Sequence, residues 1–273
     1  MNLEGRIVHR SRGAGGVIEV VDEESVRFLH FATPHKQSAM VLDDPNQLVL
    51  PYTRHMMGAL LFGEAPRRVL MVGLGGGSMA RFLLHHFPEC RMDVVEPSRR
   101  VVRVAKQFFS IHESTRLVVH LTDGARFAAN ASSRLHGAYD LILVDAFDRE
   151  GMAWSVYSRT FFDDCRLLLS RGGVMTCNLS STNWGDFKMV LDRVTERFSG
   201  AVLKLPVAHS NNEIVFAFND PDFSPDWHGV RVRAVALEAH LAPEMQWGLD
   251  FSAFIRKMIR VNIPLWRRLL PFG

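Results

Sequence analysis

The sequence is poor in cysteine and contains no long run of apolar residues. Its three cysteines, Cys90, Cys165 and Cys177, are an odd number and lack the Cys-x-x-Cys spacing of zinc and redox sites. We therefore expect no disulfide framework and a reducing, cytoplasmic compartment. No stretch reaches about eighteen apolar residues, and the N-terminal segment lacks the apolar core of a signal peptide, so neither a transmembrane helix nor an export signal is predicted.

The sequence also has little excess of positive over negative charge. The formal net charge is +3, which is too small to predict a nucleic-acid partner. No internal repeat is present, and no convincing cluster of metal ligands, because the adjacent His85 and His86 would face different ways on a helix. With 47% hydrophobic and 22% charged residues, the composition is typical of a globular protein with a substantial core.

The most informative stretch is Val-Leu-Met-Val-Gly-Leu-Gly-Gly-Gly-Ser at residues 69–78. A short apolar run ends in four glycines within five positions, and an amphipathic segment follows. This pattern predicts a strand, a tight turn and a helix, in which backbone N–H groups can approach a ligand closely. Glu96 stands 23 positions after Gly73, where a carboxylate can accept hydrogen bonds from both ribose hydroxyls of a nucleoside. A plain structural turn is the alternative interpretation.

From residue 69 onward, apolar runs alternate with helical patterns, which predicts a doubly wound α/β domain. The runs show little internal alternation, as expected when helices cover both faces of a mostly parallel sheet. A final hairpin would make the last strand antiparallel. The seven expected strands are residues 69–72, 92–95, 117–121, 141–144, 174–178, 201–206 and 213–218.

Three regions are expected. Residues 1–62 form a small N-terminal β-hairpin region with a linking helix, and residues 1–16 within it are polar and expected to be mobile. Residues 63–220 form the nucleoside-binding Rossmann-like catalytic domain. Residues 221–273 form a C-terminal extension with one helix near residues 251–261 and a basic, amphipathic tail. A membrane-surface or partner-binding tail is one interpretation; we favour packing on the body, because Pro264 interrupts the helix.

Carboxylates fall at the ends of the expected strands. Glu96 ends the second, Asp123 follows the third in Thr-Asp-Gly, and Asp145 ends the fourth with Asp148 three residues on. Ligands of open parallel sheets bind beyond the carboxyl ends of the strands, so we expect these side chains to converge on one crevice. For each aspartate, a helix N-cap is the alternative, most seriously for Asp123.

Taken together, these features resemble the spermidine synthase (polyamine aminopropyltransferase) family within the class I S-adenosylmethionine-dependent methyltransferase fold. The resemblance covers about residues 17–219 and lies in MVLDDPNQL, VLMVGLGGGSMARFLL, VVEPS, LTDGARF, YDLILVDAFD and FFDDCRLLLSRGGVMTCNLSS. It implies a Rossmann-like methyltransferase fold, a sulfonium nucleoside as co-substrate and no metal. Members of the family often form dimers, which makes a homodimer a candidate assembly.

The resemblance also implies roles for individual residues. Asp145 would be the catalytic acid beside the attacking nitrogen, accepting its proton, and the nucleoside would lie against the glycine turn, the ribose-binding Glu96 and the adenine-binding Asp123. The expected cofactor-binding residues are Gly73, Gly75, Gly77, Ser78, Glu96, Asp123 and Gly124. The expected acceptor-binding residues are Gln47, Tyr52, His55, Asp148 and Trp154, with ordinary packing as the alternative for Gln47, Tyr52 and Trp154.

The chain departs from the family pattern at three motifs. Ser78 stands where Gly-Gly-Gly-Asp-Gly has its aspartate, and Asp145-Ala-Phe-Asp148 is not followed by proline. The helix after the hairpin reads Tyr52-Thr-Arg-His55-Met where the family has Tyr-His-Glu-Met, so the glutamate is missing. Arg54 and His55 replace acidic character with basic, and a dication should bind less well beside them. We infer that the nucleoside site is kept and that the acceptor site has changed. The neutral Ser78 also makes S-adenosylmethionine itself a plausible ligand.

Three functions follow. The first is aminopropyl transfer from decarboxylated S-adenosylmethionine to an amine, with 5′-methylthioadenosine as product. The second is methyl transfer from S-adenosylmethionine to a small acceptor, with S-adenosylhomocysteine as product. The third is a non-catalytic nucleoside-binding protein. The resemblance across the hairpin, Asp145 and Asp148 favours the first.

Overall fold

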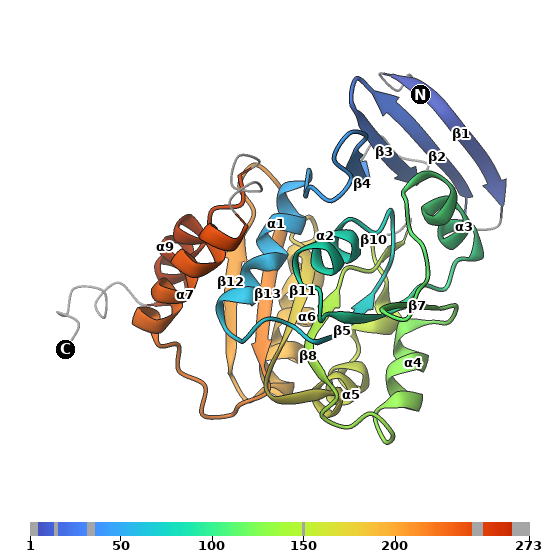
Figure 1. The fold of residues 1–273 in the computed structure, drawn as a ribbon. Helices are drawn as coiled ribbons and strands as arrows, with labels where there is room; N and C mark the ends of the chain where they lie inside the picture. The colour runs from blue at the N-terminus through green and yellow to red at the C-terminus, as the bar shows by residue number, and fades with distance from the viewer. Residues whose placement is uncertain (1–4, 14–15, 32–35, 149–150, 242–247, 264–273) are drawn as a thin grey trace.

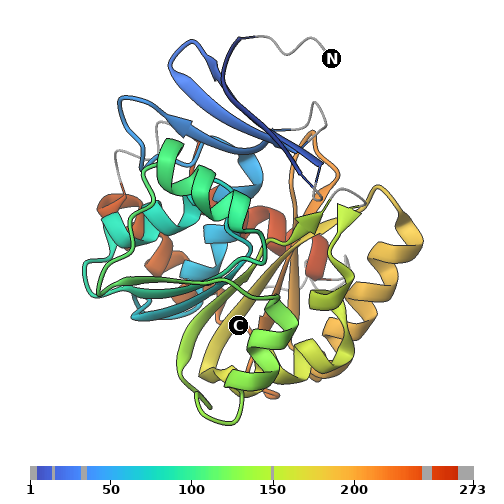
Figure 2. The ribbon, with the colours of Figure 1, turned by 90° about the vertical axis from the view of Figure 1, so that its right-hand side faces the viewer.

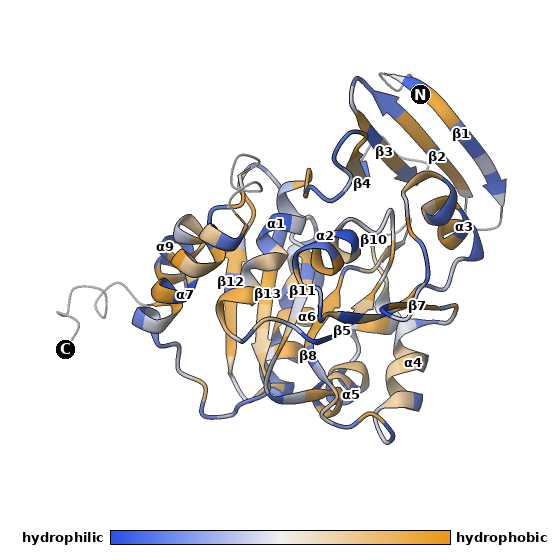
Figure 3. Cartoon of the chain, viewed as in Figure 1, coloured by the Kyte–Doolittle hydropathy of each residue, from blue (hydrophilic) through white to orange (hydrophobic). Residues whose placement is uncertain are grey.

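The computed structural model describes residues 5–13, 16–31, 36–148, 151–241 and 248–263. Figure 1 shows a large central sheet flanked by helices, with a smaller sheet at the N-terminal end. Figure 3 shows hydrophobic residues concentrated on the central strands. The fold therefore has one main α/β body and the expected β appendage.

The large sheet has seven strands in the order β12-β13-β11-β8-β5-β6-β7. All run parallel except β13, which is antiparallel to both β11 and β12. This confirms the expected doubly wound, mostly parallel sheet with an antiparallel hairpin at its end. The strands are β5 (Arg68–Val72), β6 (Arg91–Val95), β7 (Leu117–His120), β8 (Tyr139–Val144), β11 (Leu169–Ser180), β12 (Val202–Pro206) and β13 (Asn212–Phe218).

Helices cover both faces of this sheet, because its strands are apolar on both sides. One hydrophobic cluster joins the sheet to α1 (Pro51–Met56), η1 (Met57–Leu61), α2 (Ser78–His86), α3 (Arg99–Phe108), α7 (Trp227–His240) and α9 (Phe251–Asn262). The other joins it to α4 (Gly124–Ala131), η2 (Trp154–Tyr157), α5 (Arg159–Leu168) and α6 (Trp184–Arg197). The two clusters are the two halves of the core.

The N-terminal sheet corrects one expectation. Residues 6–13 form a strand, β1 (Arg6–Gly13), where the sequence predicted a mobile segment. An edge strand is held through its backbone and can stay polar, and here Arg6 and Arg10 also pair with Asp22 and Glu19 on the neighbouring strand. The other strands are β2 (Gly16–Glu23), β3 (Val26–Phe31) and β4 (Lys36–Val41), in the sheet order β1-β2-β3-β4. Figure 2 shows this sheet above one end of the large one.

Several further elements, η2 among them, were not predicted. A small antiparallel hairpin joins β9 (Phe147–Asp148) to β10 (Gly151–Met152), directly after β8. Helix α7 precedes the expected helix α9, and the two pack together beside β12 (Figure 1). The apolar side of α9 is buried, as the packed interpretation of this helix requires. The rest of the basic tail, residues 264–273, lies outside the described residues. Among the described helices, none is long and apolar enough to span a membrane.

Candidate active site

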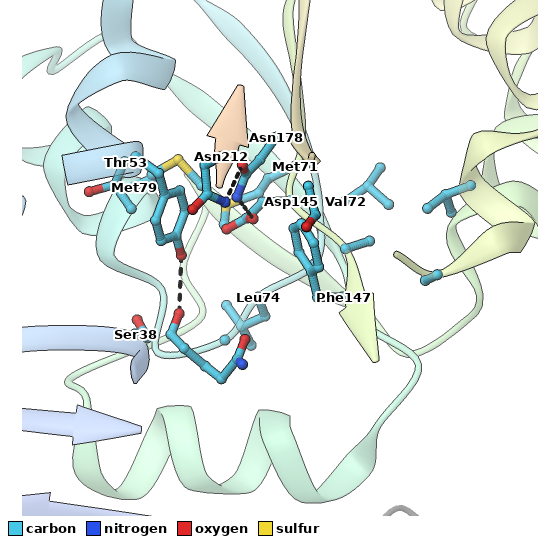
Figure 4. Close-up of a pocket in the computed structure, with 18 of the residues that line it drawn as sticks. Ser38, Thr53, Met71, Val72, Leu74, Met79, Asp145, Phe147, Asn178 and Asn212 are labelled. Atoms are coloured by element: carbon cyan, nitrogen blue, oxygen red, sulfur yellow. Dashed lines mark hydrogen bonds between the residues drawn. The ribbon is translucent and has the colours of Figure 1, made fainter. Parts of the chain in front are cut away.

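A cavity of about 840 Å³ lies at the carboxyl ends of the parallel strands, the edge where open α/β sheets bind ligands. Its walls come from the ends of β5, β6, β8 and β11, from the N-terminal sheet and α1, and from the turn between β12 and β13. Figure 4 shows these side chains around the cavity. Its size suits a nucleoside together with a small second substrate.

The glycine turn forms the floor of the cavity through Gly73 and Gly75. Both residues have a positive φ, at 93° and 53°, in the left-handed region that glycine adopts without strain. The N–H of Gly73 donates to the carbonyl of Val95 at 2.9 Å, and a Cβ at this position would overlap with the carbonyl of Asp145. Gly77, with φ at 72°, precedes the first residue of α2 and packs against Ile111. Gly77 therefore shapes the turn and does not line the cavity.

Glu96 follows β6 and is only 8% exposed. Its Oε1 accepts from the N–H of Ser98 at 2.8 Å, and its Oε2 accepts from the N–H of Leu74 at 3.2 Å. Burial raises the pKa of Glu96, while these two hydrogen bonds lower it. An ionised carboxylate accepts about four hydrogen bonds in total, so capacity remains for hydroxyl groups in the cavity.

Asp123 combines the two roles that the sequence left open. It caps α4, because its Oδ1 accepts from the N–H of Arg126 at 3.0 Å. It also lines the cavity, where its Oδ2 accepts from the hydroxyl of Ser155 at 2.8 Å. The next residue, Gly124, lies so close to Val72 and Val156 that a side chain would not fit.

Asp145 follows β8 and faces the same cavity. Its Oδ1 accepts from the Nδ2 of Asn178 at 3.0 Å, and the hydroxyl of Tyr52 lies close to its carboxylate. Burial raises the pKa of Asp145 above its ordinary value, and the hydrogen bonds from Asn178 and Tyr52 oppose that rise. A carboxylate with a raised pKa, in a cleft, is suited to accept a proton.

Tyr52 connects α1 to the N-terminal sheet. Its hydroxyl lies 3.0 Å from the carbonyl oxygen of Gln37 and also within hydrogen-bond reach of Asp145. One phenolic proton can serve only one of these two acceptors at a time. Burial raises the pKa of Tyr52 well above its ordinary value, with the Asp145 charge as a second cause, so the phenol stays protonated.

Ser78 is buried and neutral. Its hydroxyl donates to the carbonyl of Ala39 at 2.8 Å and lies 3.0 Å from the hydroxyl of Ser38. These bonds fasten the start of α2 to β4. Ser78 lines the cavity without bringing the negative charge that an aspartate would bring there.

Three of the expected acceptor-binding residues do not line the cavity. Gln47 is buried beside Asp44, to whose carboxylate its Nε2 donates at 2.7 Å. The Nδ1 of His55 donates to the carbonyl of Pro51 at 2.8 Å, the ring packs on Phe254, and burial lowers the pKa of His55 to about 4. Trp154 is 44% exposed. The backbone of Asp148 pairs with Gly151 in the β9–β10 hairpin; its side chain is outside the described part of the chain.

The sequence did not reveal a set of polar residues that also line the cavity. It comes from β4, from the end of β11 and from the β12–β13 turn, and includes Gln37, Asn178, Ser180, Thr182, His209 and Asn212. The turn His-Ser-Asn-Asn was visible in the sequence only as a turn signal. Among the described residues, no group of three or more His, Cys, Asp or Glu side chains could hold a metal ion.

Comparisons with known proteins find a matching family model and similar curated proteins. The spermine/spermidine synthase domain matches residues 50–201. A polyamine aminopropyltransferase of Chromobacterium violaceum is 35% identical over 250 residues, which cover 90% of each chain.

Two solved structures share the fold. A probable spermidine synthase from Corynebacterium glutamicum has a TM-score of 0.67 at 22% identity, covering 88% of each chain. Human methyltransferase-like protein 13, solved in complex with SAH, has a TM-score of 0.63 at 26% identity, covering 71% of this chain and 93% of that one. The fold is therefore shared with a probable spermidine synthase and with a methyltransferase-like protein.

Proposed function

Because the chain belongs to the spermine/spermidine synthase family, we propose that it transfers an aminopropyl group from decarboxylated S-adenosylmethionine to an amine acceptor. One observation carries the proposal. Half-buried Asp145 faces the same cavity as Glu96 and the glycine turn, so the proposed base and the proposed nucleoside-binding carboxylate line one cavity.

The nucleoside half of the cavity has the groups that this co-substrate needs. Gly73 and Gly75 leave the floor of the cavity without side chains, and both have the positive φ angles that favour glycine. Buried Glu96 retains acceptor capacity for ribose hydroxyls. Asp123 lies beside them at the start of α4 and can accept from an exocyclic amine. We assign the nucleoside to these residues together with Ser78.

The co-substrate supplies a carbon activated by a positively charged sulfur. The acceptor nitrogen forms a bond to that carbon as the carbon–sulfur bond breaks and a neutral thioether leaves. A nitrogen that is already protonated cannot attack, so Asp145 accepts the proton that the nitrogen loses. Asn178 holds the carboxylate in place for that transfer.

Methyl transfer from S-adenosylmethionine is the second candidate, and Ser78 favours it. The Ser78 hydroxyl is committed to Ala39 and Ser38, and it brings no negative charge toward a cationic propylamine tail. The same neutrality removes one source of repulsion against the carboxylate of a methionyl tail. The SAH-bound neighbour is a methyltransferase-like protein, which supports considering this reaction.

The test is turnover with decarboxylated S-adenosylmethionine and a panel of monoamines, diamines and polyamines. The proposal predicts release of methylthioadenosine with at least one amine and its loss in Asp145→Asn. Calorimetric titration then separates the candidates, because methyl transfer requires tighter binding of S-adenosylmethionine than of its decarboxylated form. Turnover that is lost in Asp145→Asn also excludes a non-catalytic nucleoside-binding protein.

A further inference from the structure

A chain of hydrogen bonds leads from Asp145 across two neighbouring strands. Asn178 on β11 donates through Nδ2 to the Oδ1 of Asp145 at 3.0 Å. Asn212 on β13 donates through Nδ2 to the Oδ1 of Asn178 at 2.8 Å. The hydroxyl of Ser210 in turn donates to the Oδ1 of Asn212. Figure 4 shows Asn212, Asn178 and Asp145 joined in this order.

Sheet register places these side chains together. Cys177 pairs with Val144 in the parallel ladder, so Asn178 comes directly beside Asp145. Ser180 pairs with Asn212 in the antiparallel ladder, which brings the start of β13 back toward the end of β11. Asn178 is only 2% exposed, so its amide needs partners inside the protein.

The donor-to-acceptor order of these hydrogen bonds is fixed by the chemistry of the groups. An ionised carboxylate can only accept hydrogen bonds, so Asn178 must turn its NH₂ group toward Asp145. Its carbonyl oxygen then faces Asn212, which must present its own NH₂ group. The carbonyl oxygen of Asn212 is left for a hydroxyl donor, which Ser210 supplies. Each amide therefore fixes the orientation of the next.

We propose that Asn178 and Asn212 are positioning residues for Asp145: together they hold its carboxylate in one orientation and favour its ionised form. Asn178 acts by direct contact and Asn212 acts through Asn178. Only the orientation and protonation of Asp145 follow from the contacts; the catalytic consequence rests on the proposed function.

Other ionisable groups near Asp145 belong to the elements packed around it. They are Lys36 on β4, Tyr52 on α1, Glu96 after β6, Asp123 before α4, Tyr157 on η2, Cys177 on β11 and His209 in the β12–β13 turn. Glu213, next to Asn212, lies on the opposite face of β13 and interacts with Lys204 and Lys257. Of these groups, only Tyr52 comes within hydrogen-bond reach of the carboxylate of Asp145, and its hydroxyl donates to Gln37 in the described structure. Asn178 is therefore the side-chain donor to Asp145 among the described residues.

Asn212→Asp tests the donor-to-acceptor order of these hydrogen bonds, because the side chains of asparagine and aspartate have almost the same shape. An ionised carboxylate at position 212 accepts from the NH₂ group of Asn178, which then turns its carbonyl oxygen toward Asp145. Asn211→Asp is the matched control, because it adds the same charge one residue earlier, whereas among the described residues of this turn it is Asn212 that donates to Asn178. Asn212→Ala removes the donor without adding charge.

The measurement is an NMR titration of isotope-labelled aspartate carboxyls, in which the Asp145 signal is the one missing from Asp145→Asn. We expect Asn212→Asp to raise the pKa of Asp145 by about 1 or more, Asn212→Ala to raise it less, and Asn211→Asp to raise it least. An equal rise in Asn212→Asp and Asn211→Asp, or no rise in Asn212→Ala, would overturn the inference. This measurement needs no turnover, so it stands apart from the proposed function.

Kinetics test the catalytic consequence. In Asn212→Ala we expect kcat/KM for the acceptor to fall about threefold to tenfold near about pH 6, and the loss to shrink toward about pH 9 as Asp145 ionises in both proteins. A loss that is the same at every pH would indicate general damage and contradict the positioning role. Unchanged methylthioadenosine affinity shows that the variant is folded, and absence of any transfer by the wild type would refute the proposed function alone.

Discussion

At the scale of single residues, the site depends on two carboxyl groups whose ionised form is disfavoured by burial. Burial is the largest cause of the raised pKa values of Glu96 and Asp145, and hydrogen bonds from Leu74, Ser98 and Asn178 oppose it. The sequence predicted where these carboxylates lie, because each follows an apolar strand. It did not predict Asn178 and Asn212, which meet Asp145 only through the register of β11 with β8 and β13.

Asp145→Asn should become more stabilising, relative to the wild type, as the pH rises. Because the folded pKa of Asp145 lies above its unfolded value, the folded state holds this proton longer than the unfolded state does. Stability is therefore lost as the pH rises from about 4 through the folded pKa, and asparagine avoids that loss. Thermal melting of both proteins from about pH 4 to about pH 8 checks this.

The contributions of all other ionisable groups to the pH dependence are the same in both proteins and cancel in this comparison. The difference in Tm, variant minus wild type, is expected to grow toward high pH. A difference that stays constant across the range would mean that Asp145 is ionised to the same extent in the folded and unfolded states.

At the scale of elements, the glycine turn between β5 and α2 is the part that the sequence identified best. Four glycines in five positions predicted a strand, a turn and a helix, and β5 and α2 lie directly before and after that turn. The structure adds the reason for Gly73, which is the approach of the Asp145 carbonyl. That reason was hidden from the sequence, because it depends on β5 and β8 being neighbours.

Gly73→Ala should destabilise the protein more than Gly172→Ala does. Both glycines have a positive φ, at 93° and 76°, but a Cβ at Gly172 meets nothing within 4 Å. Gly172→Ala therefore isolates the backbone cost of about 1 kcal/mol. Gly73→Ala adds the overlap with Asp145, for a total of about 3 kcal/mol in the free energy of unfolding.

Denaturant unfolding with equal m-values measures both substitutions, and methylthioadenosine binding should weaken only in Gly73→Ala. Equal destabilisation of the two variants would show that the approach of β8 does not constrain the turn.

The N-terminal strand shows the opposite case at this scale. Residues 6–13 looked like a mobile polar segment, since they have no apolar face. Their order comes from backbone pairing with β2 and from ion pairs with Asp22 and Glu19, which depend on a sheet that must already exist. Helix α7 was missed for a related reason: only Trp227, Val230, Ala234 and Leu237 are buried on it, so its apolar stripe is narrow.

At the scale of the whole molecule, the order and direction of all seven strands agree with the predicted fold class. Alternation of apolar runs and helical segments carries that information along the whole chain. The division into residues 1–62, 63–220 and 221–273 and the homodimer stay predictions. The cavity itself is a product of the whole fold, because its walls come from both sheets.

The three cysteines report on the integrity of that fold. Cys90, Cys165 and Cys177 are free and buried, and burial raises the pKa of each thiol, to about 12 for Cys90. Thiolate is the reactive form, so the native protein should react very slowly with a chromogenic thiol reagent, and the denatured protein should react at all three cysteines. Fast labelling of any cysteine in the native protein would contradict the described core.

The most direct test of the central claim is the product formed from an equal mixture of S-adenosylmethionine and its decarboxylated form, with the amine panel present. Mass spectrometry then compares the wild type with Asp145→Asn. The account predicts methylthioadenosine as the main nucleoside product of the wild type, reduced about a hundredfold or more in the variant. S-adenosylhomocysteine as the main product, or methylthioadenosine release that does not depend on Asp145, would contradict it.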